Sequence, residues 1–97
     1  MQVQFYNEGY FVCSFSIQWN GGQSERTNEV EQGDNATIDT TNLGIPDGTS
    51  CWARAYIVDG SNHDSSENFT FHADAPEVQY TITGTTSDPS FSCSGCS

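Results

Sequence analysis

The chain has 97 residues and a formal net charge of −11 at pH 7, because 13 acidic residues face only two basic ones, Arg26 and Arg54. So few cations cannot neutralise phosphates, which argues against nucleic acid as a partner and disfavours electrostatic binding to anionic lipid. The hydrophobic content of 34% is low, but aromatic residues lie in periodic runs, which is not typical of a disordered chain. We expect one small-cored domain over residues 1–97.

Short alternating runs predict strands along the whole chain. The longest, GYFVCSFSIQW at residues 9–19, has apolar residues at every second position and ends at an Asn-Gly-Gly turn, as a half-buried hairpin strand does. In chain order the predicted strands span residues 3–6, 9–19, 23–30, 36–40, 51–59, 69–71, 78–83 and 90–93. Seven or eight short strands without helical periodicity predict an all-β fold, an antiparallel β-sandwich.

Four cysteines in so short a chain predict a fold stapled by disulfides. Cys13 and Cys51 both lie on the inward side of strongly predicted strands, so a disulfide between them would cross the core. Cys93 and Cys96 would then pair locally. Other pairings stay open, because the sequence does not determine connectivity.

The same cysteines indicate an oxidising compartment, and sequons at residues 35–37 and 68–70 fit a secretory route. No signal peptide is visible, and no apolar run approaches the roughly 20 residues of a transmembrane helix. We expect a secreted protein in its mature form, without a transmembrane segment.

Two stretches, GYFVCSFSIQW at residues 9–19 and YTITGTTSDP at residues 80–89, carry a family resemblance. The first is similar to the strand that opens the C-terminal domain of thiol-activated, cholesterol-dependent cytolysins. The second resembles that domain's closing strand and its Gly-Thr-Thr-Leu-Tyr-Pro loop. The resemblance implies a four-plus-four-stranded β-sandwich whose tip loops meet a membrane.

The functional residues of that family do not carry over. Its sterol-recognising Thr-Leu pair corresponds here to Thr86-Ser87. Its tryptophan-rich undecapeptide would fall near residues 59–67, which contain three acids and no tryptophan. Burying those acids in lipid would be costly. The resemblance therefore implies the scaffold without sterol binding or pore formation.

Residues 59–67 also form the densest cluster of oxygen ligands. Asp59, Asp64 and Glu67 could suit calcium, which prefers carboxylates, but their spacing is not that of an EF-hand, and a solvated loop is the simpler interpretation. No zinc or hydrolase motif has the required spacing. We expect no cofactor and no enzyme activity.

Residues 51–57 contain the best binding candidates. If the small residues of this strand face the core, then Trp52, Arg54 and Tyr56 form an outward stripe that can stack on a sugar or a partner. The opposite orientation, with the bulky residues in the core, is equally compatible with the pattern.

The polar loop tips form a second candidate surface. Its candidate residues are Asp59, Asn62, Asp64, Thr85 and Thr86.

We therefore expect a non-enzymatic, lectin-like recognition module that binds cell-surface glycans or lipid head groups through its loop tips. A cytolysin-related, toxin-like protein with peripheral membrane binding is one alternative. An acidic protein-interaction or inhibitory domain is another. The oligomeric state is not predicted.

Overall fold

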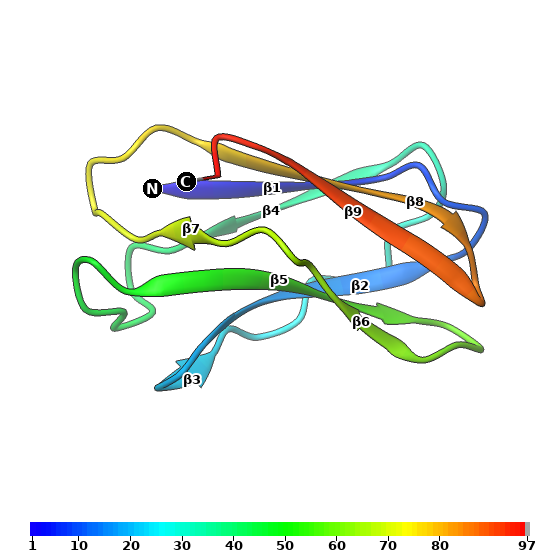
Figure 1. The fold of residues 1–97 in the computed structure, drawn as a ribbon, viewed down its shortest axis with the longest axis horizontal. Coiled ribbons are helices and arrows are strands. Elements are labelled where there is room, and N and C mark those ends of the chain that lie inside the picture. The colour runs from blue at the N-terminus through cyan, green and yellow to red at the C-terminus, as the bar shows by residue number, and fades with distance from the viewer. Residues whose placement is uncertain (97) are drawn as a thin grey trace.

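The computed structural model describes residues 1–96, which form nine strands in two sheets packed face to face (Figure 1). One sheet has the order β4-β1-β8-β9, and the other has the order β3-β2-β5-β6 with β7 also paired to β5. The strands are β1 Gln2–Asn7, β2 Cys13–Trp19, β3 Gly22–Gln23, β4 Asn35–Asp39, β5 Ser50–Ile57, β6 Asn62–Asp64, β7 Phe69–Thr70, β8 Val78–Thr85 and β9 Asp88–Ser94. The predicted all-β sandwich is confirmed.

The strand pairs are antiparallel except for β1 and β8, which run parallel. A parallel pair needs a long crossover, and most of the chain lies between these two strands. Residues 1–96 include no helix that is long and apolar enough to cross a membrane.

The core explains why β5 turns its small residues inward. Phe5 of β1 stacks on Phe15 of β2 across the two sheets, with ring centroids 4.8 Å apart, and Tyr80 of β8 lies beside Phe5. These rings are fully buried and fill the space between the sheets. Only small side chains fit against them at the centre of β5, where Ala53 and Ala55 are completely buried. The bulky residues of β5 therefore face outward.

Three predicted elements differ from the structure. The strand predicted over residues 9–19 begins only at Cys13, because the preceding residues cross from one sheet to the other. Most of residues 23–30 is not regular strand, although three of its N–H groups bond to β2. The solvated loop expected over residues 59–67 contains β6, whose polar residues pair with β5 at the edge of the sheet.

The predicted disulfide between Cys13 and Cys51 is wrong. In the antiparallel register, Cys13 lies opposite Ile57 and Cys51 lies opposite Trp19, so the two cysteines occupy opposite ends of the β2–β5 pair. Six residues of strand separate them by roughly 20 Å, whereas bridged cysteines have Cα atoms within about 7 Å. Both are buried free thiols.

The predicted local disulfide is confirmed. Cys93 and Cys96 are bonded, with their Cα atoms 5.9 Å apart, where β9 ends.

The two buried thiols are expected to resist alkylation in the folded protein. Burial raises the pKa of Cys13 to about 12 and that of Cys51 to about 11, so almost no thiolate, the reactive form, exists at neutral pH. Iodoacetamide followed by mass spectrometry should modify neither residue in the native protein and both in denaturant. A Cys13–Cys51 peptide in a non-reducing digest would contradict this result.

Candidate functional site

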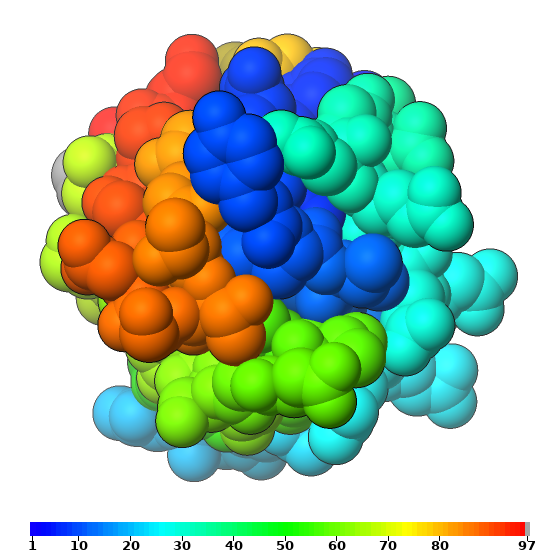
Figure 2. Space-filling view, turned by 90° about the vertical axis from the view of Figure 1, so that its right-hand side faces the viewer, coloured from blue at the N-terminus to red at the C-terminus, as the bar shows by residue number. Residues whose placement is uncertain are grey.

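Three connections meet at one end of the sandwich: residues 8–12 between β1 and β2, residues 58–61 between β5 and β6, and residues 86–87 between β8 and β9. We call this surface the loop end. Figure 2 views the molecule from this side, with the three connections in blue, green and orange in contact with one another.

Backbone hydrogen bonds join the connections of the loop end. The N–H of Tyr10 donates to the carbonyl of Gly84 at 2.9 Å, and that of Val58 donates to Val12 at 2.9 Å. The first bond links the β1–β2 connection to one sheet, and the second links it to the other. These bonds fix the connections relative to one another, so the loop end is one continuous surface rather than a set of independent loops.

The loop end contains the predicted binding residues Asp59 and Thr86, and a third, Thr85, lies beside it at the end of β8. Asp59 has a φ of 62°, a left-handed conformation that turns the chain after β5. The next residue, Gly60, packs so closely on Thr86 that an added Cβ would lie 2.8 Å from the Thr86 Cγ2. Thr85 ends β8 and lies opposite Asp88 across the turn.

Two exposed residues of the loop end were not among the binding residues predicted from the sequence. Tyr10 is 74% exposed and Val58 is 42% exposed, and among residues 1–96 these are the large hydrophobic side chains that are exposed. Val58 continues the alternation of Trp52, Arg54 and Tyr56, whereas nothing in the alternation singled out Tyr10. A local sequence pattern cannot show that these two residues, 48 positions apart in the chain, lie on one surface.

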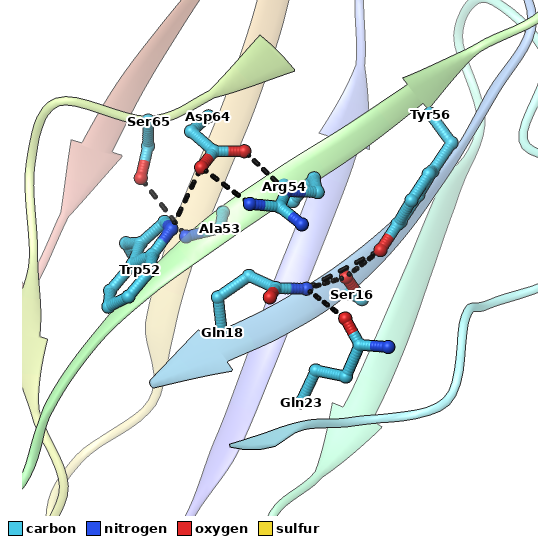
Figure 3. A network of polar contacts seen from close by, with 9 residues as sticks. All are labelled: Ser16, Gln18, Gln23, Trp52, Ala53, Arg54, Tyr56, Asp64 and Ser65. Carbon is cyan, nitrogen blue, oxygen red and sulfur yellow. Dashed lines mark hydrogen bonds and ion pairs between the residues drawn. The ribbon is translucent and has the colours of Figure 1, made fainter. Parts of the chain in front are cut away.

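The outward stripe of β5 forms a second site, shown in Figure 3. Register places Arg54 opposite Asp64 of β6, and the guanidinium donates to both carboxylate oxygens, Nε at 2.6 Å and Nη2 at 3.0 Å. The Trp52 Nε1–H donates to the same carboxylate at 3.1 Å. Asp64 thereby holds both side chains in place, and the Trp52 ring is left partly exposed.

Tyr56 belongs to a different set of contacts on this face. Its hydroxyl lies 3.0 Å from the Ser16 Oγ, which also accepts a hydrogen bond from Gln18 Nε2 at 2.7 Å (Figure 3). The Arg26 guanidinium lies 3.8 Å from the centre of the Tyr56 ring, a cation–π contact. One face of that ring is therefore already occupied, while Asn62 lies opposite Tyr56 on β6. Of the predicted stripe, Trp52 is the aromatic residue still open to a ligand.

The contact with Arg54 has a measurable pH signature. The hydrogen bond from Arg54 holds the pKa of Asp64 below its ordinary value. A carboxyl whose pKa is lowered by folding stabilises the protein above its unfolded pKa of about 4 and loses this contribution as the pH falls through the folded pKa.

We expect Asp64→Asn to lower the free energy of unfolding by roughly 1 kcal/mol at neutral pH, the upper range for a partly exposed pair. The difference from the wild type should shrink as the pH falls below about 4, because the wild-type carboxyl then becomes protonated. Urea denaturation at several pH values measures this, with the exposed Asp74→Asn as the control. A difference that does not change with pH would contradict the assignment.

The residues considered as possible calcium ligands do not lie together. Asp64 is engaged by Arg54, and Asp59, Asp64 and Glu67 do not come together. Among residues 1–96, the one group of three potential metal ligands in close proximity is Glu67, Cys93 and Cys96. The two cysteines of that group are joined in a disulfide and so cannot bind metal as thiolates.

The sequence matches no protein-family model and no curated protein. Solved structures nevertheless share the fold. Wild-type pneumolysin has a TM-score of 0.57 at 12% identity over 97% of this chain and 23% of its own. Suilysin from Streptococcus suis has a TM-score of 0.53 at 13% identity over 96% of this chain and 22% of its own.

One comparison decides which part of those toxins is similar. The membrane-binding domain of pneumolysin, solved by itself, has a TM-score of 0.54 at 13% identity, and the match covers 96% of this chain and 94% of that domain. The fold is that of the cytolysin membrane-binding domain. The chain spans less than a quarter of the length of the whole toxins, and at this identity the likeness concerns the fold alone.

Proposed function

We propose that this protein is a secreted, non-enzymatic recognition module that binds membrane surfaces peripherally through its loop end. The observation that carries the proposal is the convergence of Tyr10 and Val58, both exposed, on this one end. Tyrosine suits the membrane interface, because its ring is apolar and its hydroxyl stays hydrated. The fold shared with the membrane-binding domain of pneumolysin supports the same surface role.

The charges around the loop end indicate which membranes it would bind. Glu8, Asp59 and Asp88 are exposed there, and the chain carries a net charge of −11. These carboxylates are repelled by anionic lipids, and placing them in the hydrocarbon layer would be costly. The proposal is therefore shallow binding to zwitterionic or uncharged head groups.

Co-sedimentation with liposomes tests the proposal. The protein should pellet with phosphatidylcholine vesicles and pellet less when phosphatidylserine is added. Tyr10→Ser and Val58→Ser should each weaken partitioning, by about tenfold for tyrosine, which corresponds to about 1.4 kcal/mol. Trp52→Ala, far from the loop end on β5, is the matched control and should leave partitioning unchanged.

Absence of pelleting with every lipid composition would reject the membrane proposal. The comparison of vesicles with and without cholesterol answers a separate question. A requirement for cholesterol would mean that the Thr86-Ser87 pair recognises sterol although serine stands in place of the leucine of the cytolysin pair.

Glycan binding is the second candidate function. It is favoured by Trp52, whose ring is partly exposed and whose position is fixed by Asp64, with the charged groups of Arg54 and Asp64 beside it. An aromatic surface flanked by hydrogen-bonding groups suits a sugar ring. A glycan array should then show binding that Trp52→Ala abolishes and Tyr10→Ser does not, which separates this candidate from lipid binding.

A further inference from the structure

The two long sides of the sandwich differ in how they are closed. On one side, β6 and β9 come together, and the His63 ring stacks on Phe91 with centroids 5.8 Å apart and an interplanar angle of 12°. On the other side, β4 and the segment of residues 24–30 leave a groove of about 760 Å³. The residues of this side appear in cyan and teal at the right of Figure 2. We call this groove the side groove.

One wall of the side groove is a free strand edge. β4 is the last strand of its sheet, and among residues 1–96 it pairs with β1 alone. The N–H of Thr40 donates to the carbonyl of Met1 at 3.0 Å, and in an antiparallel pair such bonds recur at every second residue. The backbone groups of Asn35, Thr37 and Asp39 therefore point away from β1. They offer the hydrogen bonds that an added strand requires.

The opposite wall is not a regular strand and so offers no regular ladder of bonds. Ser24, Thr27 and Val30 donate their N–H groups to carbonyls of β2 at 2.9, 2.8 and 2.7 Å. These residues therefore extend the other sheet and do not reach across to β4. An extended guest in the side groove would pair with β4.

Apolar side chains line the floor of the side groove. Ala36 and Ile38 lie opposite Phe5 and Val3 in the β1–β4 register, so they point to the inner side of the sheet. Both remain only partly buried, as does Leu43 beside them. A strand added to β4 would direct every second side chain onto this floor. Apolar side chains at those positions of the added strand would complete the burial of Ala36, Ile38 and Leu43.

The rim of the side groove is acidic. Glu25, Glu29 and Asp34 line it and are exposed. Arg26 also lines it, but its guanidinium lies over the Tyr56 ring at 3.8 Å. The charge complementary to this rim is positive. A second copy of the chain would bring the same acids to the contact and is disfavoured for that reason.

We propose that the side groove binds an extended, basic peptide segment that joins the sheet as a further strand beside β4. The guest would alternate apolar residues, which contact the floor, with lysine or arginine, which face the acidic rim. This activity is independent of the loop end and of its proposed membrane binding.

The probe for the first test is a synthetic peptide of alternating lysine and valine with blocked ends. We expect it to bind in isothermal titration and to shift the backbone amide resonances of Asn35, Thr37 and Asp39 in NMR spectra. Two control peptides are tested with the wild-type protein. Methylation of alternate peptide nitrogens should weaken binding by about tenfold or more, because a methylated nitrogen cannot donate a hydrogen bond to the strand edge. Replacement of the lysines of the peptide by glutamate should abolish binding.

Two pairs of variants locate the site. Glu25→Gln, Glu29→Gln and Asp34→Asn together should weaken binding about tenfold at low salt. The combination of Asp74→Asn, Glu77→Gln and Asp88→Asn, which changes the net charge equally, should alter it less than about twofold.

Thr37→Pro, which removes an N–H that points away from β1, should abolish binding. Thr37→Val keeps that N–H and should bind normally.

Four results would overturn the proposal. The first is no binding of the lysine–valine peptide, and the second is equal binding of its methylated form. The third is an equal loss in both charge variants, which would mean non-specific attraction. Self-association that Thr37→Pro abolishes would assign the edge to a second copy and would likewise overturn the proposal.

Discussion

Replacement of Asn7 by alanine is expected to lower the free energy of unfolding by about 2–4 kcal/mol. Asn7 is completely buried at the end of β1. Its Nδ2 donates to the carbonyls of Phe11 and Val30 at 2.8 and 2.9 Å, and its Oδ1 accepts the N–H of Gly9 at 2.9 Å. Alanine would leave the Phe11 carbonyl and the Gly9 N–H without these partners inside the protein, which is the costly outcome for buried polar groups. The Val30 carbonyl would keep its bond from the Cys13 N–H at 3.2 Å.

The same change should loosen the loop end. Two of the three bonds hold the β1–β2 connection, which carries Tyr10, so Asn7→Ala should also raise the rate of amide hydrogen exchange at Tyr10. Urea denaturation measures the stability, and Asn42→Ala, on an exposed loop, is the control and should stay within about 0.5 kcal/mol of the wild type. Equal stability of the two variants would contradict the role given to Asn7.

Replacement of Gly84 by alanine is the second large effect, with an expected loss of roughly 3 kcal/mol or more. Gly84 has a φ of 97°, and a Cβ there would collide with the carbonyl oxygen of Asp88 and lie 3.2 Å from the Pro89 Cα. These are backbone atoms of the adjacent strand, which cannot rotate away as the end of a side chain can. The turn between β8 and β9 would have to open.

A matched control separates the collision from backbone strain. Gly33 has a similar φ of 89°, but an added Cβ would meet no atom within 4 Å. Gly33→Ala should therefore cost only about 1–2 kcal/mol, the price of a left-handed conformation in a residue with a side chain. Thermal denaturation followed by circular dichroism compares the two variants. A similar loss in both would mean that the turn adapts without difficulty.

Membrane binding should distinguish the two glycine variants as well. Gly84 accepts the N–H of Tyr10, so a displaced Gly84 would move the residue proposed to contact lipid. Gly33→Ala should bind phosphatidylcholine vesicles as the wild type does. Gly84→Ala should bind them more weakly even at temperatures where it remains folded.

The sequence by itself determined the local structure and much of the fold class. Alternation identified β2, β5 and β8, because a period of two survives in any half-buried strand. The separation of three residues between Cys93 and Cys96 made their local disulfide predictable. The resemblance of residues 9–19 and 80–89 to the cytolysin domain indicated the correct scaffold. The first stretch contains β2 of one sheet, and the second contains most of β8 of the other.

Only the tertiary structure decided the contacts between distant strands. Cys13 and Cys51 have equally good inward positions, yet the β2–β5 register places them at opposite ends, and register depends on the partner strand and not on either sequence alone. The outward direction of Trp52 follows from the bulk of Phe5 and Tyr80 across the core. The loop end and the side groove exist for the same reason. Each is made of segments far apart in the chain, which no local pattern can bring together.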